Sequence, residues 1–236
     1  MAVFFINTPF KGLKLGYTNN TQGFSKGSFS KLNLSNNVRD NPSVVERNRN
    51  LFKSYIDADI KWLKQDHTNI VKRFDECETE PCDAVFSDKS KQVCAILTAD
   101  CLPVLIFDKK LAKVAAIHAG WKGLANGVLE STLKEFKGLD MVAWFGPCIT
   151  QKYFEVGQDV YDAFIEQNAT YTQAFISNGD NKYFFDMKFV AKQILNQYNC
   201  IDVVDSGFCT YSNKKFYSHR KDGGVTGRQA SFIWID

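Results

Sequence analysis

The sequence predicts an α/β or α+β fold, a single domain in which helices flank a central mixed β-sheet. Short apolar runs, β-branched or rich in leucine, recur along the chain with the length of buried strands. Between them lie stretches whose apolar residues repeat at helical spacing. The two kinds of segment alternate irregularly, which favours a mixed sheet. With 236 residues, 44% of them hydrophobic, and no repeat or linker, we expect one domain over residues 1–236.

The first part of the chain begins with strands and a capped helix. Residues 2–6 and 13–18 have strand-like composition. Asp40-Asn41-Pro42 places a polar N-cap ahead of a proline in the first turn, which predicts a helix that runs to about residue 56. Residues 60–65 are again strand-like, so this part supplies three strands and one helix.

Three apolar runs in the middle of the chain predict the central strands. They occupy residues 93–98, 102–107 and 113–118, and each is short enough to be a buried strand. A helix is expected at residues 121–136, where the apolar side chains share one face. The remaining expectations are helices at 157–167 and 187–198, the second capped by Asp186, and strands at 141–145, 201–205, 215–219 and 231–235.

Composition and charge exclude several classes of function. Lysine and arginine number 29 against 26 acidic residues, and a net charge of +3 is too small to indicate nucleic acid as the main partner. No stretch approaches the roughly 18 apolar residues of a membrane helix, and we expect no targeting segment. Seven cysteines, an odd number, favour reduced thiols in the cytoplasm. Three histidines are too few for a multi-copper oxidase site. No pattern indicates an oligomeric state.

Two strand ends carry residues that suggest chemistry. Cys101 follows one apolar run and His118 ends the run after next, so the two side chains lie close together if those strands pair. A cysteine beside a histidine fits either a nucleophilic dyad or part of a zinc site. His67 is the available third ligand, and two histidines with one cysteine leave a position open for water. The simpler alternative makes Cys101 a small buried apolar residue, but the adjacent Asp100 disfavours it, because a buried carboxylate needs a partner.

Motifs along nearly the whole chain resemble one bacterial family. The two most specific are residues 97–104, LTADCLPV, and residues 118–123, HAGWKG. The others are residues 23–34, Asn48-Arg49, and residues 146–149, 154–157, 218–222 and 226–228. The family is known as the laccase-domain or multicopper polyphenol oxidase family, the YfiH-like family and the peptidoglycan editing factor family. Its members are described as zinc-dependent purine nucleoside phosphorylases that also deaminate adenosine.

The resemblance implies a YfiH-like fold and a metal site. The family's zinc ligands fall on His67, Cys101 and His118, with copper as the less favoured metal. The implied reaction converts inosine, adenosine or guanosine and phosphate into a base and ribose 1-phosphate. Adenosine deaminase and methylthioadenosine phosphorylase side activities are implied as well. The chain departs from the family where Asp66 replaces an apolar residue and His219 replaces a tyrosine.

Residues for phosphate and for proton transfer follow from the chemistry of this reaction. Arg49, Arg220 and Arg228 are candidates to hold phosphate, because the guanidinium fork matches its oxygens. Ser25, in a loop that contains glycines, is expected to add a hydroxyl donor. Asp100, beside the thiol, is expected to orient a ligand or to carry a proton. The predicted catalytic residues are therefore Asp100, Cys101 and His118.

Three other functions stay open at the level of sequence. A cysteine hydrolase or amidase that acts on peptidoglycan precursors through Cys101 and His118 needs no metal. A zinc-stabilised module without enzymatic activity acts through a partner, although structural zinc sites are usually closed by four protein ligands. A copper polyphenol oxidase is the weakest alternative. The spacing of Cys77 and Cys82 suits a second metal clip or a disulfide, but no second pair accompanies it, which favours a structural role.

Overall fold

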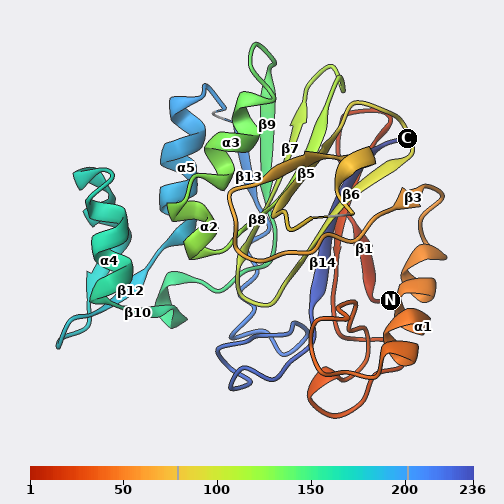
Figure 1. The fold of residues 1–236 in the computed structure, drawn as a ribbon, viewed down its shortest axis with the longest axis horizontal. Coiled ribbons are helices and arrows are strands. Elements are labelled where there is room, and N and C mark those ends of the chain that lie inside the picture. Colours follow the sequence, from red (N-terminus) through yellow and green to blue (C-terminus); the bar gives the residue numbers. More distant parts are fainter. Residues whose placement is uncertain (79, 201) are drawn as a thin grey trace.

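Two large β-sheets form the body of the protein in a computed structural model that describes residues 1–78, 80–200 and 202–236 (Figure 1). The first sheet runs in the order β1 (Val3–Phe5), β2 (Leu13–Thr18), β14 (Gln229–Ile235), β6 (Gln92–Thr98) and β3 (Asp59–Ile60). The second runs in the order β13 (Asp202–Asp205), β9 (Met141–Phe145), β7 (Leu102–Asp108), β8 (Val114–Ala119), β5 (Ala84–Ser87) and β4 (Val71–Arg73). Both sheets mix directions, because β3–β6, β13–β9 and β4–β5 pair in parallel and the other neighbours antiparallel. The predicted α/β class with mixed strand directions is confirmed, although the strands divide between sheets.

The two large sheets pack face to face and enclose part of the core. The residues that meet there are all buried: Leu15, Ile96 and Ile233 from the first sheet, and Leu105 and Trp144 from the second. The turn at residues 99–101 carries the chain from β6 in one sheet to β7 in the other. Strands β7 and β8 then pair antiparallel, with Pro103 opposite His118. This crossing places the turn beside the end of β8.

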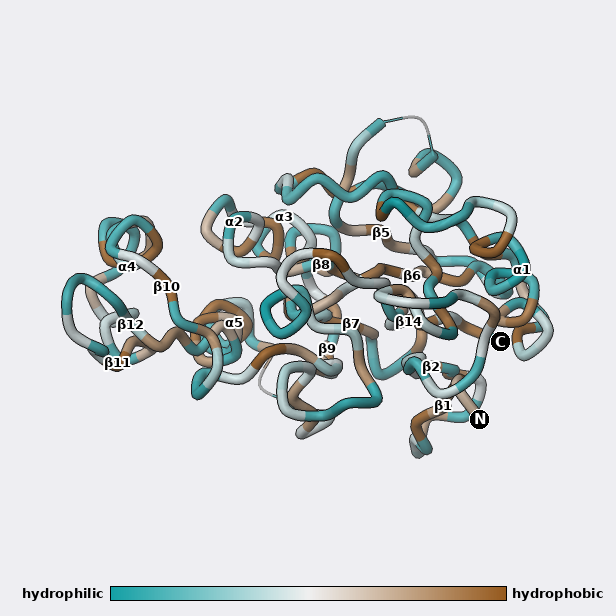
Figure 2. The backbone as a smooth tube through the Cα atoms, turned by 90° about the horizontal axis from the view of Figure 1, so that it is seen from below, coloured by the Kyte–Doolittle hydropathy of each residue, from teal (hydrophilic) through white to brown (hydrophobic). Residues whose placement is uncertain are grey.

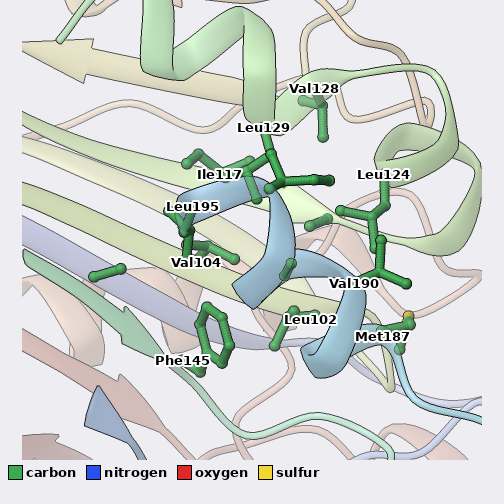
Figure 3. Close-up of a cluster of buried hydrophobic side chains, with 14 of the residues drawn as sticks. Leu102, Val104, Ile117, Leu124, Val128, Leu129, Phe145, Met187, Val190 and Leu195 are labelled. Carbon is green, nitrogen blue, oxygen red and sulfur yellow. The ribbon is translucent and has the colours of Figure 1, made fainter. Parts of the chain in front are cut away.

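Helices cover the outer faces of both sheets. The layers are therefore helices, the second sheet, the first sheet and a helix, in that order (Figure 2). On one side lie α2 (Trp121–Ala125), α3 (Val128–Lys134) and α5 (Met187–Gln197). Their buried residues Leu124, Leu129, Val190 and Leu195 pack against Leu102, Val104, Ile117 and Phe145 of the strands (Figure 3). On the other side lies α1 (Pro42–Lys53), whose Phe52 meets Phe232 with ring centroids 5.2 Å apart.

A small lobe projects beyond α5 (Figure 1). It contains α4 (Gln158–Ile165) and an antiparallel sheet in the order β10 (Glu155–Gly157), β12 (Lys182–Phe185) and β11 (Phe175–Ser177). Its interior is aromatic, since the rings of Phe175 and Phe185 stack with centroids 4.4 Å apart and Phe164 packs on both. Short 3-10 turns lie at Gly27–Phe29, Phe74–Glu76, Gln151–Tyr153 and Ala169–Ala174.

Two predicted helix starts are confirmed by their caps. The Asn41 side chain accepts a hydrogen bond from the Ser43 amide at 2.9 Å, and Pro42 occupies the first turn of α1. The Asp186 carboxylate accepts from the Lys188 and Phe189 amides at the start of α5. Among the described residues, no helix combines the length and the apolar character that crossing a bilayer requires.

Three predicted elements are wrong in detail. The helix expected at residues 121–136 is broken into α2 and α3, because Gly127 takes a left-handed φ of 85° between them. Beyond Ile60 the expected strand is irregular, because the Gln65 side chain, rather than its backbone, bonds to both backbone groups of Leu97. Residues 215–219 form turns and irregular backbone, and the Gln229 side chain, rather than the backbone of a neighbouring strand, bonds to the Tyr217 backbone.

Other strands escaped the sequence reading because they are short. Strands β4, β5, β10, β11 and β12 have four residues or fewer, and the pattern of alternation is weak over that length. The strand expected at 201–205 is observed as β13, and its first predicted residue, 201, lies outside the described residues.

Candidate metal centre

Three side chains from separate elements converge at one edge of the body. His67 lies in the turn before β4, Cys101 in the crossing turn between β6 and β7, and His118 near the end of β8. Their ligand atoms all lie within 4.8 Å of one another, and Cys101 Sγ is 3.6 Å from His67 Nε2. The two imidazole ring centroids are 4.8 Å apart. The antiparallel pairing of β7 and β8 brings the thiol beside His118, as the pattern of strand ends predicted.

Gly120 leaves the space that this convergence needs. A Cβ at this position would lie 2.7 Å from His67 Cδ2 and 2.9 Å from Cys101 Sγ. The backbone φ of −65° suits any residue, so the requirement is for space and not for backbone freedom. The glycine therefore keeps a small hollow open between a thiol and an imidazole.

The donor set fits a metal ion of borderline softness. Two imidazoles and one thiol are ligands that zinc accepts readily, and three protein ligands with an open position are typical of catalytic zinc sites. A multi-copper centre needs more imidazoles than the three histidines of the whole sequence provide. Among the described residues, no other group of three histidine, cysteine or acidic side chains converges in this way.

The thiol and the imidazole shift each other's pKa in opposite directions. Burial would raise the pKa of Cys101, but the charge of His118 and hydrogen bonds from His118 and His67 lower it to about 6. Burial would lower the pKa of His118, but the Cys101 thiolate and Asp83 raise it to about 9. Near neutral pH the pair is therefore a thiolate beside an imidazolium, and a metal ion would displace the imidazolium proton.

Asp83 is a residue of the site that the sequence reading missed. It is fully buried just before β5, and its Oδ1 lies 2.7 Å from His118 Nδ1. Burial would raise the pKa of this carboxyl, but the hydrogen bond and charge of His118, with hydrogen bonds from Thr68, lower it to about 2. A signal was available, because an aspartate between Cys82 and the apolar start of β5 is a carboxylate in a buried segment that needs a partner.

Asp100 is turned toward the C-terminal loop. Its Oδ1 accepts from Thr210 Oγ1 at 2.6 Å, and its Oδ2 accepts from Ser218 Oγ at 3.0 Å and from the Arg220 amide at 2.7 Å. Its φ is 91°, a left-handed conformation that aspartate tolerates. Within the described residues, its carboxylate makes no hydrogen bond to the metal cluster. The partner that a buried carboxylate requires is therefore supplied here by Thr210, Ser218 and Arg220 of the C-terminal loop.

A cavity of about 500 Å³ opens onto the three metal-ligand candidates. This volume lies in the range of roughly 300–1,000 Å³ that small-molecule sites occupy. Its basic and polar lining includes Arg220, Arg228, Lys122, His219, Ser35 and Asn37. Its apolar and aromatic lining includes Trp121, Phe154, Val38, Leu63, Ile149 and Met187. The cavity therefore combines a metal-ligand cluster, cationic groups and aromatic rings.

The two C-terminal arginines line this cavity, and the side chain of each donates to backbone carbonyls. Arg228 donates from one terminal nitrogen to the carbonyls of Thr226 and Gly227 at 2.9 and 3.0 Å. Burial lowers the pKa of its guanidinium, while the charges of Cys101 and Asp100 oppose that shift. Arg220 donates to the Glu155 carbonyl at 2.8 Å and lies over the Phe154 ring at 5.5 Å.

Arg49 and Ser25 do not line the cavity. Arg49 Nε donates to the Leu34 carbonyl at 3.0 Å, and its guanidinium lies 4.8 Å from the centre of the Trp62 ring. Ser25 Oγ donates to Asp40 at 2.7 Å and accepts from Asn48 at 2.9 Å. Both residues therefore tie the N-terminal loop to α1 or its neighbours. Nothing in the sequence distinguished this structural role from the phosphate binding that was predicted.

Comparison with known proteins agrees with this architecture. A sequence profile of the family described as multi-copper polyphenol oxidoreductase laccase matches residues 14–236. The purine nucleoside phosphorylases YfiH of Shigella flexneri and of Escherichia coli are each 39% identical over 232 residues, which covers 95% of this chain and 95% of the relative. A crystal structure of a Neisseria meningitidis protein, 37% identical, superposes with a TM-score of 0.95 over 100% of both chains. The chain therefore belongs to the YfiH family, the family described as multi-copper polyphenol oxidoreductase laccase.

Proposed function

We propose that the chain is a zinc-dependent purine nucleoside phosphorylase whose one catalytic domain spans residues 1–236. The observation that carries the proposal is a cavity in which a cluster of two histidines and a cysteine faces Arg220, Arg228 and Lys122. Relatives 39% identical over nearly the whole chain bear the name of this activity, which supports the same assignment. The site thus unites a metal-ligand set with the cationic groups that phosphate requires.

His67, Cys101 and His118 would hold the zinc ion. When bound, zinc would supply a Lewis acid to this cavity. Gly120 contributes by leaving the hollow between the ligands free of side-chain atoms. The thiolate character of Cys101 prepares the cluster for a cation, since the thiolate is the form that binds metals.

The chain's own residues would bind and orient the two substrates. Trp121 and Phe154 offer aromatic faces for the purine, while Arg220 and Arg228 offer guanidinium forks for phosphate. Only one terminal nitrogen of Arg228 is engaged by backbone carbonyls in the described residues, which leaves the other N–H groups for an anion. Binding phosphate and nucleoside in one cavity converts their encounter into a reaction between neighbours.

The reaction balances without a further reactant. A phosphate oxygen forms a bond to C1′ of the ribose while the bond from C1′ to the purine nitrogen breaks. The electron pair of the broken bond stays with the base, which takes up a proton. His219 and Lys122 line the cavity and would supply that proton, and the proton that hydrogen phosphate loses when its oxygen bonds to C1′ restores the donor. The products are the free base and ribose 1-phosphate.

Release of hypoxanthine from inosine tests the proposal. The zinc-loaded protein is expected to release the base only when phosphate is present, and guanosine, adenosine and methylthioadenosine are the next substrates to compare. Conversion of adenosine to inosine tests the proposed deaminase side activity separately. If the zinc-loaded protein leaves all four nucleosides intact with phosphate present, the phosphorylase assignment is wrong.

One observation favours a second candidate, a cysteine hydrolase or amidase, for which peptidoglycan precursors are the proposed substrates. Cys101, His118 and Asp83 follow one another as thiol, imidazole and orienting carboxylate, which is the arrangement that nucleophilic catalysis uses. This function predicts activity in metal-free protein and rapid alkylation of Cys101. Amidase activity that persists after zinc is chelated favours the hydrolase, and absence of amidase activity from the metal-free protein excludes it.

The proposal extends to metal, partners and location. We propose zinc over copper because the cluster has a single cysteine and two of the three histidines in the chain. Metal analysis after expression with both ions checks this choice. The proposed partners are nucleosides and phosphate rather than nucleic acid or membrane. A reducing cytoplasm is proposed because the seven cysteines are free thiols.

A further inference from the structure

The buried carboxylate of Asp83 makes five hydrogen bonds, four with residues 66–68 and one with the ring of His118. Oδ2 accepts from the Asp66 amide at 3.2 Å, from the Thr68 amide at 2.6 Å and from Thr68 Oγ1 at 2.9 Å. Oδ1 accepts from the His67 amide at 3.1 Å and lies 2.7 Å from His118 Nδ1. The main-chain carbonyl of Asp83 also accepts from the His118 amide at 2.7 Å.

We infer that Asp83 is a positioning residue that sets both histidine ligands of the proposed metal site at once. It holds the ring of His118 through Nδ1, which leaves Nε2 to face the cluster. It holds the backbone of His67, whose φ of 56° is left-handed, a conformation that a residue with a side chain adopts only where its surroundings hold it. The carboxylate therefore orients one ligand by its ring and the other by its peptide.

The chemistry of the carboxylate explains why this position needs an aspartate. An ionised carboxylate can only accept hydrogen bonds. Four of its five partners are N–H or O–H donors, and the fifth, His118, is a donor when its proton is on Nδ1. A carboxylate accepts at both oxygens, so it selects the tautomer in which Nδ1 is protonated and Nε2 has a free lone pair. Zinc ligands of this kind commonly have their second ring nitrogen bonded to a carboxylate.

An asparagine at this position would reverse that selection. Its amide nitrogen avoids the Oδ2 side, because two backbone N–H groups point there. The nitrogen therefore takes the Oδ1 side, where one backbone N–H, that of His67, loses its acceptor, and it donates to His118 Nδ1. This contact moves the ring proton to Nε2 and blocks the ligand atom. The substitution Asp83→Asn thus keeps the size of the side chain but favours the wrong tautomer.

A matched control exists elsewhere in the fold. Asp108 is 2% exposed, and its carboxylate accepts from the amides of Lys110, Ala112 and Asp140, away from the cavity. Asp108→Asn removes a carboxylate that is about as buried as that of Asp83, but it leaves the hydrogen bonds to the histidines unchanged. Any general cost of losing such a charge is therefore shared by the two variants.

The test measures zinc affinity by competition with a chromophoric chelator, together with the absorption spectrum of the cobalt-substituted protein. Asp83→Asn is expected to weaken zinc binding by roughly 10- to 100-fold and to alter the cobalt spectrum. Asp108→Asn is expected to retain the wild-type values, whatever it does to the unfolding temperature. Unchanged zinc affinity in Asp83→Asn, or an equal loss in Asp108→Asn, overturns the inference.

A second measurement needs no variant and covers a failure of Asp83→Asn to fold. Nitrogen-15 NMR of the zinc-loaded wild-type protein is expected to show His118 protonated at Nδ1, and a deprotonated Nδ1 overturns the inference. The inference rests on the proposed metal site but not on the proposed reaction. A protein that binds zinc as described yet leaves inosine intact would contradict the phosphorylase and leave the role of Asp83 standing.

Discussion

Replacing Gly120 by alanine is expected to weaken zinc binding without unfolding the protein. The new methyl carbon would lie 2.7 Å from His67 Cδ2 and 2.9 Å from Cys101 Sγ. To restore ordinary contact at 3.4 Å, the ring must retreat by about 0.7 Å and the sulfur by about 0.5 Å. Zinc sites hold their ligand distances within about 0.2 Å, so these displacements exceed what the metal tolerates.

The strain arises mainly in the metal-loaded state. The exposed side chain of His67 can move aside when no ion draws it inward, and the φ of −65° at Gly120 suits alanine. Overpacking of one methyl group costs about 1–3 kcal/mol, which converts to a loss of about 5- to 150-fold in zinc affinity. The unfolding temperature of the metal-free variant is expected to stay close to that of the wild type.

Competition titration with a zinc chelator measures this loss, with circular dichroism as the check on folding. Gly157→Ala is the matched control, because among the described residues its new methyl group would meet only the movable carboxylate of Asp159. Wild-type zinc affinity in folded Gly120→Ala would refute the idea that the hollow between His67 and Cys101 is the metal position.

Three further outcomes are expected. Zinc affinity is expected to rise about tenfold per pH unit between about pH 6 and pH 9. In that range Cys101, with a pKa of about 6, is a thiolate and His118, with a pKa of about 9, carries the one proton that zinc displaces. A zinc affinity that does not change with pH in competition titrations argues against that pair. Arg228→Gln raises the KM for phosphate about tenfold or more in the inosine assay, whereas Arg49→Gln leaves it unchanged, and the reverse pattern would restore Arg49 to the site. Phe136→Ala, which empties a fully buried position, lowers the free energy of unfolding by about 3–5 kcal/mol in urea titrations, and a loss below about 1 kcal/mol would contradict its place in the core.

The pattern of strand ends was sufficient to predict that Cys101 and His118 meet, but it did not reveal Asp83, the carboxylate that bonds to His118. Cys101 and His118 were predicted to meet because each lies at the end of an apolar run, and the pairing of β7 with β8 brings them together. Asp83 escaped notice because β5, the strand that follows it, is only four residues long. Its partner His118 lies 35 positions away in sequence, so no local pattern links the two.

The basic residues show where chemistry without geometry is insufficient. A guanidinium fork suits phosphate wherever it stands, so Arg49, Arg220 and Arg228 were equivalent as sequence candidates. The fold separates them, because Arg49 lies over Trp62 beside α1 while the two others border the cavity. Asp100 was expected to serve the thiol next to it, yet its left-handed φ is accompanied by hydrogen bonds to the C-terminal loop.

The sequence by itself determined the α/β class, the buried strands and the choice of the three candidate ligands that converge, because apolar periodicity and the scarcity of histidine can be read without the fold. Only the tertiary structure decided how the strands divide between two sheets, which arginines face the cavity, and which carboxylate orients the histidines. Those features depend on contacts between residues far apart in sequence: Asp83 and His118 are 35 positions apart, and Asp100 and Arg220 are 120 positions apart. Such contacts arise from packing whole sheets and loops together, and the spacing of residues along one segment does not encode them.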